Sequence, residues 1–287
     1  MIDLHVHTIH SSDGQHAPAE ILAMARREGV GTLAFCDHMD IRAASLGLDL
    51  AREAGIELFT GVELSTSRDG REHHLLCYGF DPGSRLVRDF IEESCERIWG
   101  LVPEVIEAIC SMGFRLDRRD FRGWGRSVPT GVSFLDALLE CNPGDPRLHR
   151  YTTGDRSGSP YLNFYQDFSR LDFARAVVSG LPDLEETIRY FSGEGILVLA
   201  HPGHADETVL GELKRCGLDG IEVYSTHHSQ SDTRWLAGIA GSLGLLRSAG
   251  SDFHGERIKP GIALGRVSGE PDQGLLDAIR ARMYSWQ

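Results

Sequence analysis

Short apolar runs alternate with amphipathic segments along most of the chain. The predicted strands are residues 1–7, 32–38, 57–63, 71–80, 196–202, 220–225 and 245–250. Between them, apolar positions at helical spacing predict helices at 18–29, 43–55, 183–195, 206–216, 231–244 and 272–282. The first of these has Pro18 in its first turn and Gly29 at its end, as helices often do. Strands that alternate with helices favour an α/β fold built on a parallel sheet.

Residues 84–182 do not follow this alternation. Apolar side chains from Val87 to Ile109 recur at helical spacing, which predicts a long helix, and Pro103 should kink or split it. From Phe114 to Tyr161 the chain is rich in Arg, Gly, Pro and Asp and lacks strand periodicity. We therefore expect a small, mainly helical subdomain, residues 84–182, inserted into an α/β domain formed by residues 1–83 and 183–287.

Polar side chains gather at the ends of the predicted strands. His5 and His7 share one face of the first strand, and Asp13 follows in a Ser-Ser-Asp-Gly turn that can fold back over the strand end. Taken alone, such a histidine pair could be chance in a chain with 13 histidines. Further candidates lie at or just beyond the ends of later strands, or on the short fourth strand: Asp37, His38, Glu63, His74, His201, Asp252 and His254. In a β/α barrel these ends face one mouth, so the donors would converge there, and no cysteine is among them.

Composition narrows the class of protein. The chain has 287 residues, of which 41% are hydrophobic and 25% charged, enough for one large α/β barrel or two small domains. The formal net charge of −13 opposes binding of long nucleic acid, so an anionic substrate should be small and held by local positive charge. The six cysteines are scattered, and no apolar run reaches the roughly 18 residues of a membrane span. We expect a cytoplasmic protein without a membrane partner, and the oligomeric state stays open.

Taken in order, these motifs resemble the PHP (polymerase and histidinol phosphatase) family of metal-dependent phosphoesterases, of the type that acts on nucleoside bisphosphates or cyclic phosphates. The resemblance rests on Asp3-Leu-His-Val-His-Thr, Ser12-Asp-Gly, Asp37-His38, Gly61-Val-Glu63, His74-Leu-Leu-Cys-Tyr-Gly, Ala200-His-Pro and Gly250-Ser-Asp-Phe-His-Gly. It covers essentially the whole chain outside the insertion. It implies a distorted (β/α)7 barrel with a trinuclear metal site at its mouth.

The resemblance also implies a role for each donor. One ion would be held by His5, His7, Glu63 and Asp252. Glu63 would bridge to a second ion held also by His74 and His201, while Asp13, His38 and His254 match the third position. His73 is an alternative to His74, but the family's histidine directly precedes the apolar pair and the Tyr-Gly. Asp37 is expected to orient His38 or a neighbouring ligand.

The expected chemistry follows from these ligands. Imidazole and carboxylate donors favour manganese, with iron or zinc as alternatives, for the three divalent ions. Such a site would carry a charge of about +3 and attract phosphate locally. A metal-bridging hydroxide would attack phosphorus and release orthophosphate. For the leaving oxygen, His227 and His228 are candidate proton donors; His228 matches the family's Tyr-x-x-x-His-Ser histidine and is predicted as general acid or as phosphate ligand.

The insertion is expected to set specificity. Nucleotide-acting relatives carry Gly-Arg-Pro-His, whereas this chain has Gly125-Arg126-Ser-Val-Pro, which keeps Arg126 as a phosphate clamp or a solvated loop residue and lacks the histidine. We therefore predict hydrolysis of a small phosphomonoester or cyclic phosphodiester of a sugar or nucleotide. The alternatives are a nucleoside 3′,5′-bisphosphate phosphatase or 5′–3′ exonuclease on short oligoribonucleotides, and a non-catalytic metal-binding regulator. A lysine-bridged amidohydrolase is disfavoured, because Lys214 and Lys259 fall in a predicted helix and a late loop.

Overall fold

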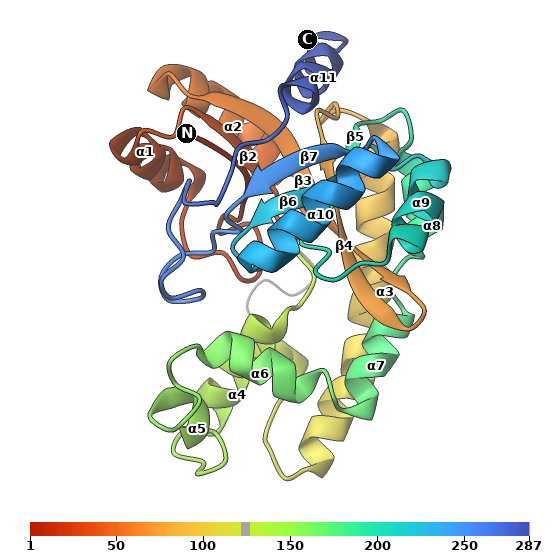
Figure 1. Cartoon of the computed structure of the whole chain (residues 1–287). Helices are drawn as coiled ribbons and strands as arrows, with labels where there is room; N and C mark the ends of the chain where they lie inside the picture. The colour runs from red at the N-terminus through yellow and green to blue at the C-terminus, as the bar shows by residue number, and fades with distance from the viewer. Residues whose placement is uncertain (122–126, 287) are drawn as a thin grey trace.

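The strands form one mixed sheet in chain order (Figure 1). The computed structural model describes residues 1–121 and 127–286. The strands are β1 (Ile2–Val6), β2 (Thr32–Phe35), β3 (Glu57–Arg68), β4 (Arg71–Tyr78), β5 (Ile196–Leu199), β6 (Gly220–Ser225) and β7 (Leu246–Gly250). β2 and β5 are short apolar runs that are buried almost throughout, as expected for strands covered on both faces.

β4 departs from the predicted parallel arrangement. It runs antiparallel to both β3 and β5, whereas the other neighbouring pairs are parallel. The cause is the turn Asp69-Gly70, whose φ values of 52° and 70° allow a two-residue hairpin between β3 and β4. The prediction of a parallel sheet is therefore wrong at this strand, because a hairpin reverses the chain where a helical crossover would preserve its direction.

The sheet curls until its first and last strands meet. The segment after β7 runs beside the end of β1, where the His7 amide donates to the Phe253 carbonyl at 2.9 Å. Phe253 in turn donates its amide to His5 O at 3.4 Å. The fold is thus an α/β, nearly closed seven-stranded barrel, which confirms the distorted barrel that the family resemblance implies.

Helices that follow the strands cover the barrel. They are α1 (Pro18–Glu28), α2 (Arg42–Ala54), α8 (Leu184–Phe191), α9 (Glu207–Cys216), α10 (Gln230–Leu243) and α11 (Gln273–Tyr284). α1 starts at Pro18 and ends against Gly29, whose φ of 74° is the left-handed conformation that glycine adopts at low cost. Leu184, Ile188 and Leu213 of α8 and α9 are fully buried in one apolar cluster with side chains of β4, β5 and β6. Burial of each such side chain stabilises the fold by about 1.5–3 kcal/mol.

The inserted segment is helical. It contains α3 (Arg85–Ser111), the 3-10 turn η1 (Arg118–Asp120), α4 (Gly131–Cys141), α5 (His149–Thr152), α6 (Pro160–Phe168) and α7 (Asp172–Ser179). Figure 1 shows α4, α5 and α6 as a group below the barrel, with α3 and α7 running between the two. The group has its own apolar core, which includes Trp99, Leu135 and Phe164.

The long helix α3 differs from its prediction in one respect. It continues through Pro103 as a single 27-residue helix, so the predicted split does not occur. Val102 and Val105, on either side of this proline, are buried in the core of the insertion, and this packing holds the helix together across it. No helix in the described part of the chain combines the length and the apolar composition needed to cross a bilayer.

Candidate metal centre

Buried histidines and carboxylates meet at one end of the barrel. The donor atoms of His5, His7, Glu63 and Asp252 lie within 4.8 Å of one another, and all four side chains are buried. Glu63 Oε2 lies 3.1 Å from Nε2 of both histidines, and Asp252 Oδ1 lies 3.2 Å from His7 Nε2. β1 supplies the imidazoles from one face of its end, β3 supplies the glutamate, and the turn after β7 supplies the aspartate. The sequence predicts these four as one ligand set, and the structure brings them together.

A second group of donors shares His7 with the first. It adds Asp13, His38 and His254, whose donor atoms also lie within 4.8 Å of one another. Asp13 Oδ2 lies 3.4 Å from His38 Nε2 and 3.6 Å from His254 Nε2. The turn that carries Asp13 needs Gly14, because a Cβ there would lie 1.8 Å from a backbone carbonyl oxygen. The chain therefore folds back over the strand end, as the Ser-Ser-Asp-Gly pattern predicts.

Glu63 lies between the two donor groups described above and two further histidines, His74 and His201. Its Oε1 lies 2.9 Å from His74 Nδ1 and 3.3 Å from His201 Nε2. Its Oε2 faces the β1 histidines and lies 3.2 Å from His38 Nδ1. A carboxylate whose two oxygens face separate imidazoles has the arrangement of a bridging ligand. His38, Glu63 and His74 form one further close group of donors, and His201 forms another with His227 and Asp252.

His74, and not His73, faces this centre. His74 pairs with Ser65 across the β3–β4 ladder and His73 pairs with Thr66, so the two side chains lie on opposite faces of the strand. The Nε2 atom of His74 lies 3.3 Å from Glu72 Oε1. The geometry thus agrees with the choice of His74.

Two predicted ligands, and the residue after a third, have a strained backbone. His201 and Asp252 have φ values of 28° and 55°, and Met39, directly after His38, has φ of 48°. Non-glycine residues rarely adopt this left-handed region, and such strain gathers at functional sites.

Burial and charge oppose each other in the centre. Burial alone would raise the pKa of Glu63, but the surrounding imidazoles, His5 foremost, hold it well below its usual value. Burial lowers the pKa of His7, but Asp252 and Glu63 outweigh it and raise the pKa to about 9. The opposite holds for His254, where burial and the charge of His7 lower the pKa to about 4. The carboxylates therefore stay ionised, and adjacent imidazoles differ widely in basicity.

Three buried atoms lack an ordinary partner. His38 Nδ1, His74 Nδ1 and Asp252 Oδ1 are shielded from solvent, and each lies 2.9–3.2 Å from a carboxylate or imidazole atom without a hydrogen bond of good geometry among the described residues. A cation would be a partner for all three and would offset the cost of about 1–3 kcal/mol for a buried polar atom left unpaired. Imidazole nitrogen and carboxylate oxygen suit manganese, iron or zinc. The residues therefore fit a site for divalent metal ions.

The comparison with known families agrees with this donor set. Residues 3–114 match the PHP domain, and this segment carries the donors of β1, β2, β3 and β4. Residues 3–114 thus form a PHP domain. The family resemblance inferred from the motifs is thus confirmed, and the buried donors fit the binding of metal ions that this resemblance implies.

Curated relatives of this PHP protein act on phosphate esters. A 5′-3′ exoribonuclease of Haemophilus influenzae is 28% identical over 262 residues, which cover 88% of this chain and 89% of that protein. A phosphoribosyl 1,2-cyclic phosphate 1,2-diphosphodiesterase of Eggerthella lenta is 27% identical over 259 residues, 88% of this chain and 94% of that protein. A 3′,5′-nucleoside bisphosphate phosphatase of Chromobacterium violaceum is 28% identical over 264 residues, 88% of this chain and 87% of that protein.

A solved structure shares the fold of the PHP protein. The crystal structure of a protein from Bifidobacterium adolescentis, described as a metal-dependent phosphoesterase, superposes with a TM-score of 0.76 at 23% identity. The match covers 98% of this chain and 96% of that one. The relatives confirm the prediction of a hydrolase that acts on phosphoric ester bonds.

Glu222 is part of the centre that sequence reasoning missed. It is fully buried on β6, and its Oε1 lies 3.1 Å from His5 Nδ1. Its Oε2 accepts the His201 amide at 3.0 Å. A carboxylate on the far nitrogen of a ligand histidine fixes the ring orientation and raises its basicity. One signal was available, because Glu222 is the only charged residue in the apolar strand Gly-Ile-Glu-Val-Tyr-Ser.

The structure places His227, and not His228, beside the donor groups. His228 Nδ1 lies 3.0 Å from Val223 O, and its Nε2 accepts the Gly203 amide at 3.3 Å. Both ring nitrogens are thus engaged with backbone, which argues against the prediction of His228 as general acid or phosphate ligand. His227 faces the centre instead, with Nε2 2.6 Å from Asp252 Oδ2.

Asp37 contacts the turn that follows the β1 histidines. Its carboxylate accepts the Thr8 amide at 2.6 Å and the Thr8 hydroxyl at 2.8 Å. It therefore fixes the backbone directly after His7, and that it orients His38 or a neighbouring ligand stays a prediction.

The insertion meets the barrel at loops that carry donors. Ser12 donates to Thr130 Oγ1 at 3.2 Å, and Tyr165 donates to Glu72 Oε2 at 2.9 Å. Arg257 Nη1 lies 3.2 Å from the Asp136 carboxylate on α4. We call these three contacts the latches. Each barrel residue in a latch lies within three positions of a predicted metal ligand.

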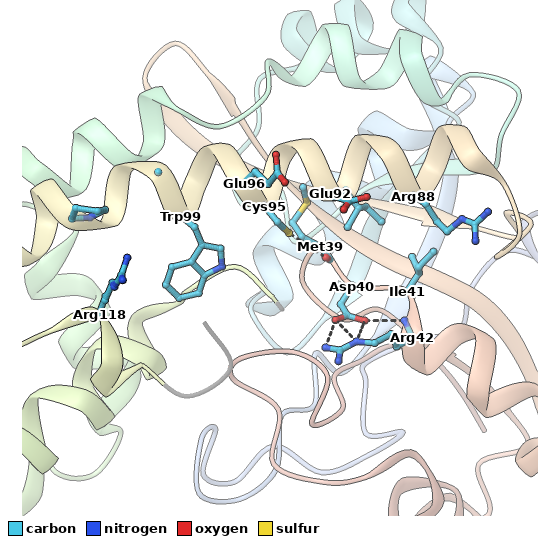
Figure 2. Close-up of a pocket in the computed structure, with 13 residues that line it drawn as sticks. Met39, Asp40, Ile41, Arg42, Arg88, Glu92, Cys95, Glu96, Trp99 and Arg118 are labelled. Atoms are coloured by element: carbon cyan, nitrogen blue, oxygen red, sulfur yellow. Dashed lines mark hydrogen bonds and ion pairs between the residues drawn. The ribbon is translucent and has the colours of Figure 1, made fainter. Parts of the chain in front are cut away.

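A cavity of about 820 Å³ lies between α3 and the loop after β2 (Figure 2). Its lining includes Met39, Arg42, Trp99 and Arg118, and Figure 2 shows Asp40 paired with Arg42 at its edge. Met39 directly follows His38 in the chain, but none of the predicted metal ligands is among the described residues that line the cavity. The predicted clamp Arg126 lies outside the described residues.

Proposed function

We propose that this PHP phosphoesterase releases orthophosphate from a small phosphorylated metabolite, a phosphomonoester or cyclic phosphodiester of a sugar or nucleotide. The observation that carries the proposal is Glu63, whose two carboxylate oxygens each lie within 3.3 Å of different histidines at the mouth of the barrel. This arrangement supports a cluster of divalent ions in place of a single one.

We assign three ions to the donors, with manganese first and iron or zinc as alternatives. His5, His7, Glu63 and Asp252 would hold one, and Asp13, His38 and His254 another. Glu63, whose Oε1 faces both rings, would hold the third with His74 and His201. When bound, such ions supply Lewis-acid polarisation of the phosphoryl oxygen and lower the pKa of a coordinated water toward neutrality.

The protein's own side chains supply orientation and a proton. Glu222 holds the His5 ring in place through Nδ1. His227 Nε2, beside Asp252 on the partly exposed side of the centre, is the atom we assign to deliver a proton to the leaving oxygen. The cavity beside Met39 and Trp99 offers room for the organic part of the substrate.

The second candidate is a nucleoside 3′,5′-bisphosphate phosphatase or a 5′–3′ exonuclease on short oligoribonucleotides. It is favoured by relatives with those activities that are as similar to this chain as the cyclic phosphodiesterase is. The net charge of −13 favours a small substrate over long nucleic acid in either case.

The test is a substrate panel with manganese-loaded protein. Phosphomonoesters, bisphosphates, cyclic sugar phosphates and short oligoribonucleotides are each incubated with it, and orthophosphate and nucleotides are quantified. We expect turnover of at least one small ester, loss of turnover with a chelator, and recovery on adding manganese. Metal binding without turnover of any compound would instead support the non-catalytic regulator.

A further inference from the structure

The loop after His254 brings a lysine back to the centre. Lys259 Nζ pairs with Asp252 Oδ2 and lies 3.4 Å from His227 Nε2. Its side chain is 27% exposed, whereas that of Asp252 is 4% exposed. The ammonium group therefore lies on the solvent side of a buried carboxylate.

The backbone of this loop is fixed from both sides. The Lys259 amide donates to Gly255 O at 2.9 Å, and Gly255 has φ of 95° with the Gln15 side chain where a Cβ would be. Ile258, only 3% exposed, belongs to the apolar core of the insertion, and Arg257 makes the latch to α4. Lys259 is thus held at the junction of barrel and insertion.

Asp252 divides its two oxygens between two environments. Oδ1 faces His5 and His7 in the buried donor group. Oδ2 faces the partly exposed pair of His227 and Lys259. The lysine ammonium and the imidazole therefore lie together on the partly exposed edge of the centre.

We propose that Lys259 is a substrate-binding residue, whose ammonium group contacts a non-bridging oxygen of the phosphoryl group beside His227. The inference rests on the proposed function and extends it to a contact made by the protein itself. An ammonium group suits this task because it offers three donors and a full charge to an oxyanion. The other reading is that Lys259 only neutralises Asp252, and it predicts a different response to substitution.

The chain provides a matched control. Lys214, the other lysine, lies on α9 and donates to the Leu243 and Gly244 carbonyls at the end of α10. It contacts no predicted metal ligand in the described residues. Labelling or substitution at Lys214 therefore reports effects unrelated to the centre.

The first experiment labels the lysines of the manganese-loaded wild-type protein by reductive methylation, with and without saturating inorganic phosphate. Peptide mass spectrometry measures each rate. We expect phosphate to slow labelling of Lys259 about fivefold or more and to leave Lys214 unchanged. Equal labelling of Lys259 with and without phosphate would overturn the inference. Wild-type protein that binds no phosphate by calorimetry would overturn the proposed function as well, so the two failures are distinguishable.

The second experiment compares Lys259→Met, Lys259→Arg and Lys214→Met. Metal content is measured by elemental mass spectrometry, and inorganic phosphate binding to the loaded proteins by calorimetry. We expect Lys259→Met to keep its metal and to bind phosphate about tenfold more weakly, Lys259→Arg to recover part of the loss, and Lys214→Met to match wild type. If Lys259→Met lost metal and phosphate binding in equal proportion, the neutralising role would be correct. If it failed to fold, the labelling of wild-type protein would decide.

Discussion

The barrel mouth and the insertion are built in different ways. At the mouth, hydrogen-bonded strands fix the donors, and Glu63 and Asp252 are almost fully buried among histidines. The insertion has an apolar core of its own and meets the donor loops through the three latches, whose side chains are partly exposed. From this difference we propose that strand ends hold the chemistry and that the insertion adjusts how substrate meets it. Substitutions in the two regions should therefore differ in size and in kind.

The largest effect is expected at the mouth. Asp252→Asn or His7→Ala should abolish phosphate release and lower metal content while leaving the fold largely intact, because both side chains lie in the donor group shared with Glu63. Orthophosphate release and elemental mass spectrometry measure the two effects. Asp49→Asn, on the exposed face of α2, is the control. Retained turnover in Asp252→Asn would argue against the proposed metal centre.

A smaller effect is expected from a substitution of Glu222, which contacts a predicted ligand and is not itself one. Glu222→Gln should weaken metal affinity about 10- to 100-fold, since it removes the carboxylate that orients His5. Calorimetric titration with manganese measures it. Glu212→Gln is the matched control, because that carboxylate pairs with Arg68 outside the centre. Unchanged affinity in Glu222→Gln would mean that β1 alone orients the ring.

Substitutions in the latches should lower activity less than substitutions of the predicted metal ligands. Tyr165→Phe removes the hydrogen bond to Glu72, which in turn lies 3.3 Å from His74 Nε2. A hydrogen bond of about 0.5–1.5 kcal/mol corresponds to a fall of roughly 2- to 10-fold in kcat/KM. Steady-state kinetics on the best substrate of the panel measures it, with Tyr190→Phe as control. A loss as large as that of Asp252→Asn would erase the distinction between the two regions.

The smallest effect, a change in the free energy of unfolding, is expected at an ion pair far from both regions. Arg280 on α11 holds Glu57 of β3 through two hydrogen bonds of 2.7 and 2.9 Å and lowers the pKa of that carboxyl. Both groups are partly exposed, so solvent screening limits the pair to about 1 kcal/mol or less in the free energy of unfolding. Glu57→Gln should remove this stability at pH 7.

The pH dependence of that pair follows from the direction of the shift. Because the folded-state pKa of Glu57 is lowered, its stabilisation is present above the ordinary pKa and is lost as pH falls through the folded value. Denaturant unfolding of wild type and Glu57→Gln should therefore differ at pH 7 and converge in acid. A difference that grew on acidification would contradict the assignment. The exposed Glu53 on α2 gives a control substitution.

The sequence predicted much of this centre, since its motifs depend on local geometry. His5 and His7 share a face because a strand has a two-residue period, and the family motif distinguished His74 from His73. The reversal of β4 was missed because the two-residue turn was not read as a hairpin. Each of these three features depends on residues that are only a few positions apart in the chain.

Other features could not be predicted because position there depends on contacts that are distant in sequence. The ladder between β6 and β7 shifts register between Glu222 and Tyr224, so strand alternation cannot be counted forward to His227 and His228. Lys259 was assigned to a late loop, and tertiary contacts, among them the packing of Ile258 into the insertion, hold that loop beside Asp252. Tertiary contacts of this kind leave no periodic signal.

The most direct test of the metal centre is anomalous diffraction from crystals of the protein grown with manganese. The account predicts strong anomalous peaks among His5, His7, Glu63 and Asp252, and further peaks beside Asp13 and His38 and beside His74 and His201. The absence of any peak among these donors, in crystals of protein that releases phosphate, would contradict it.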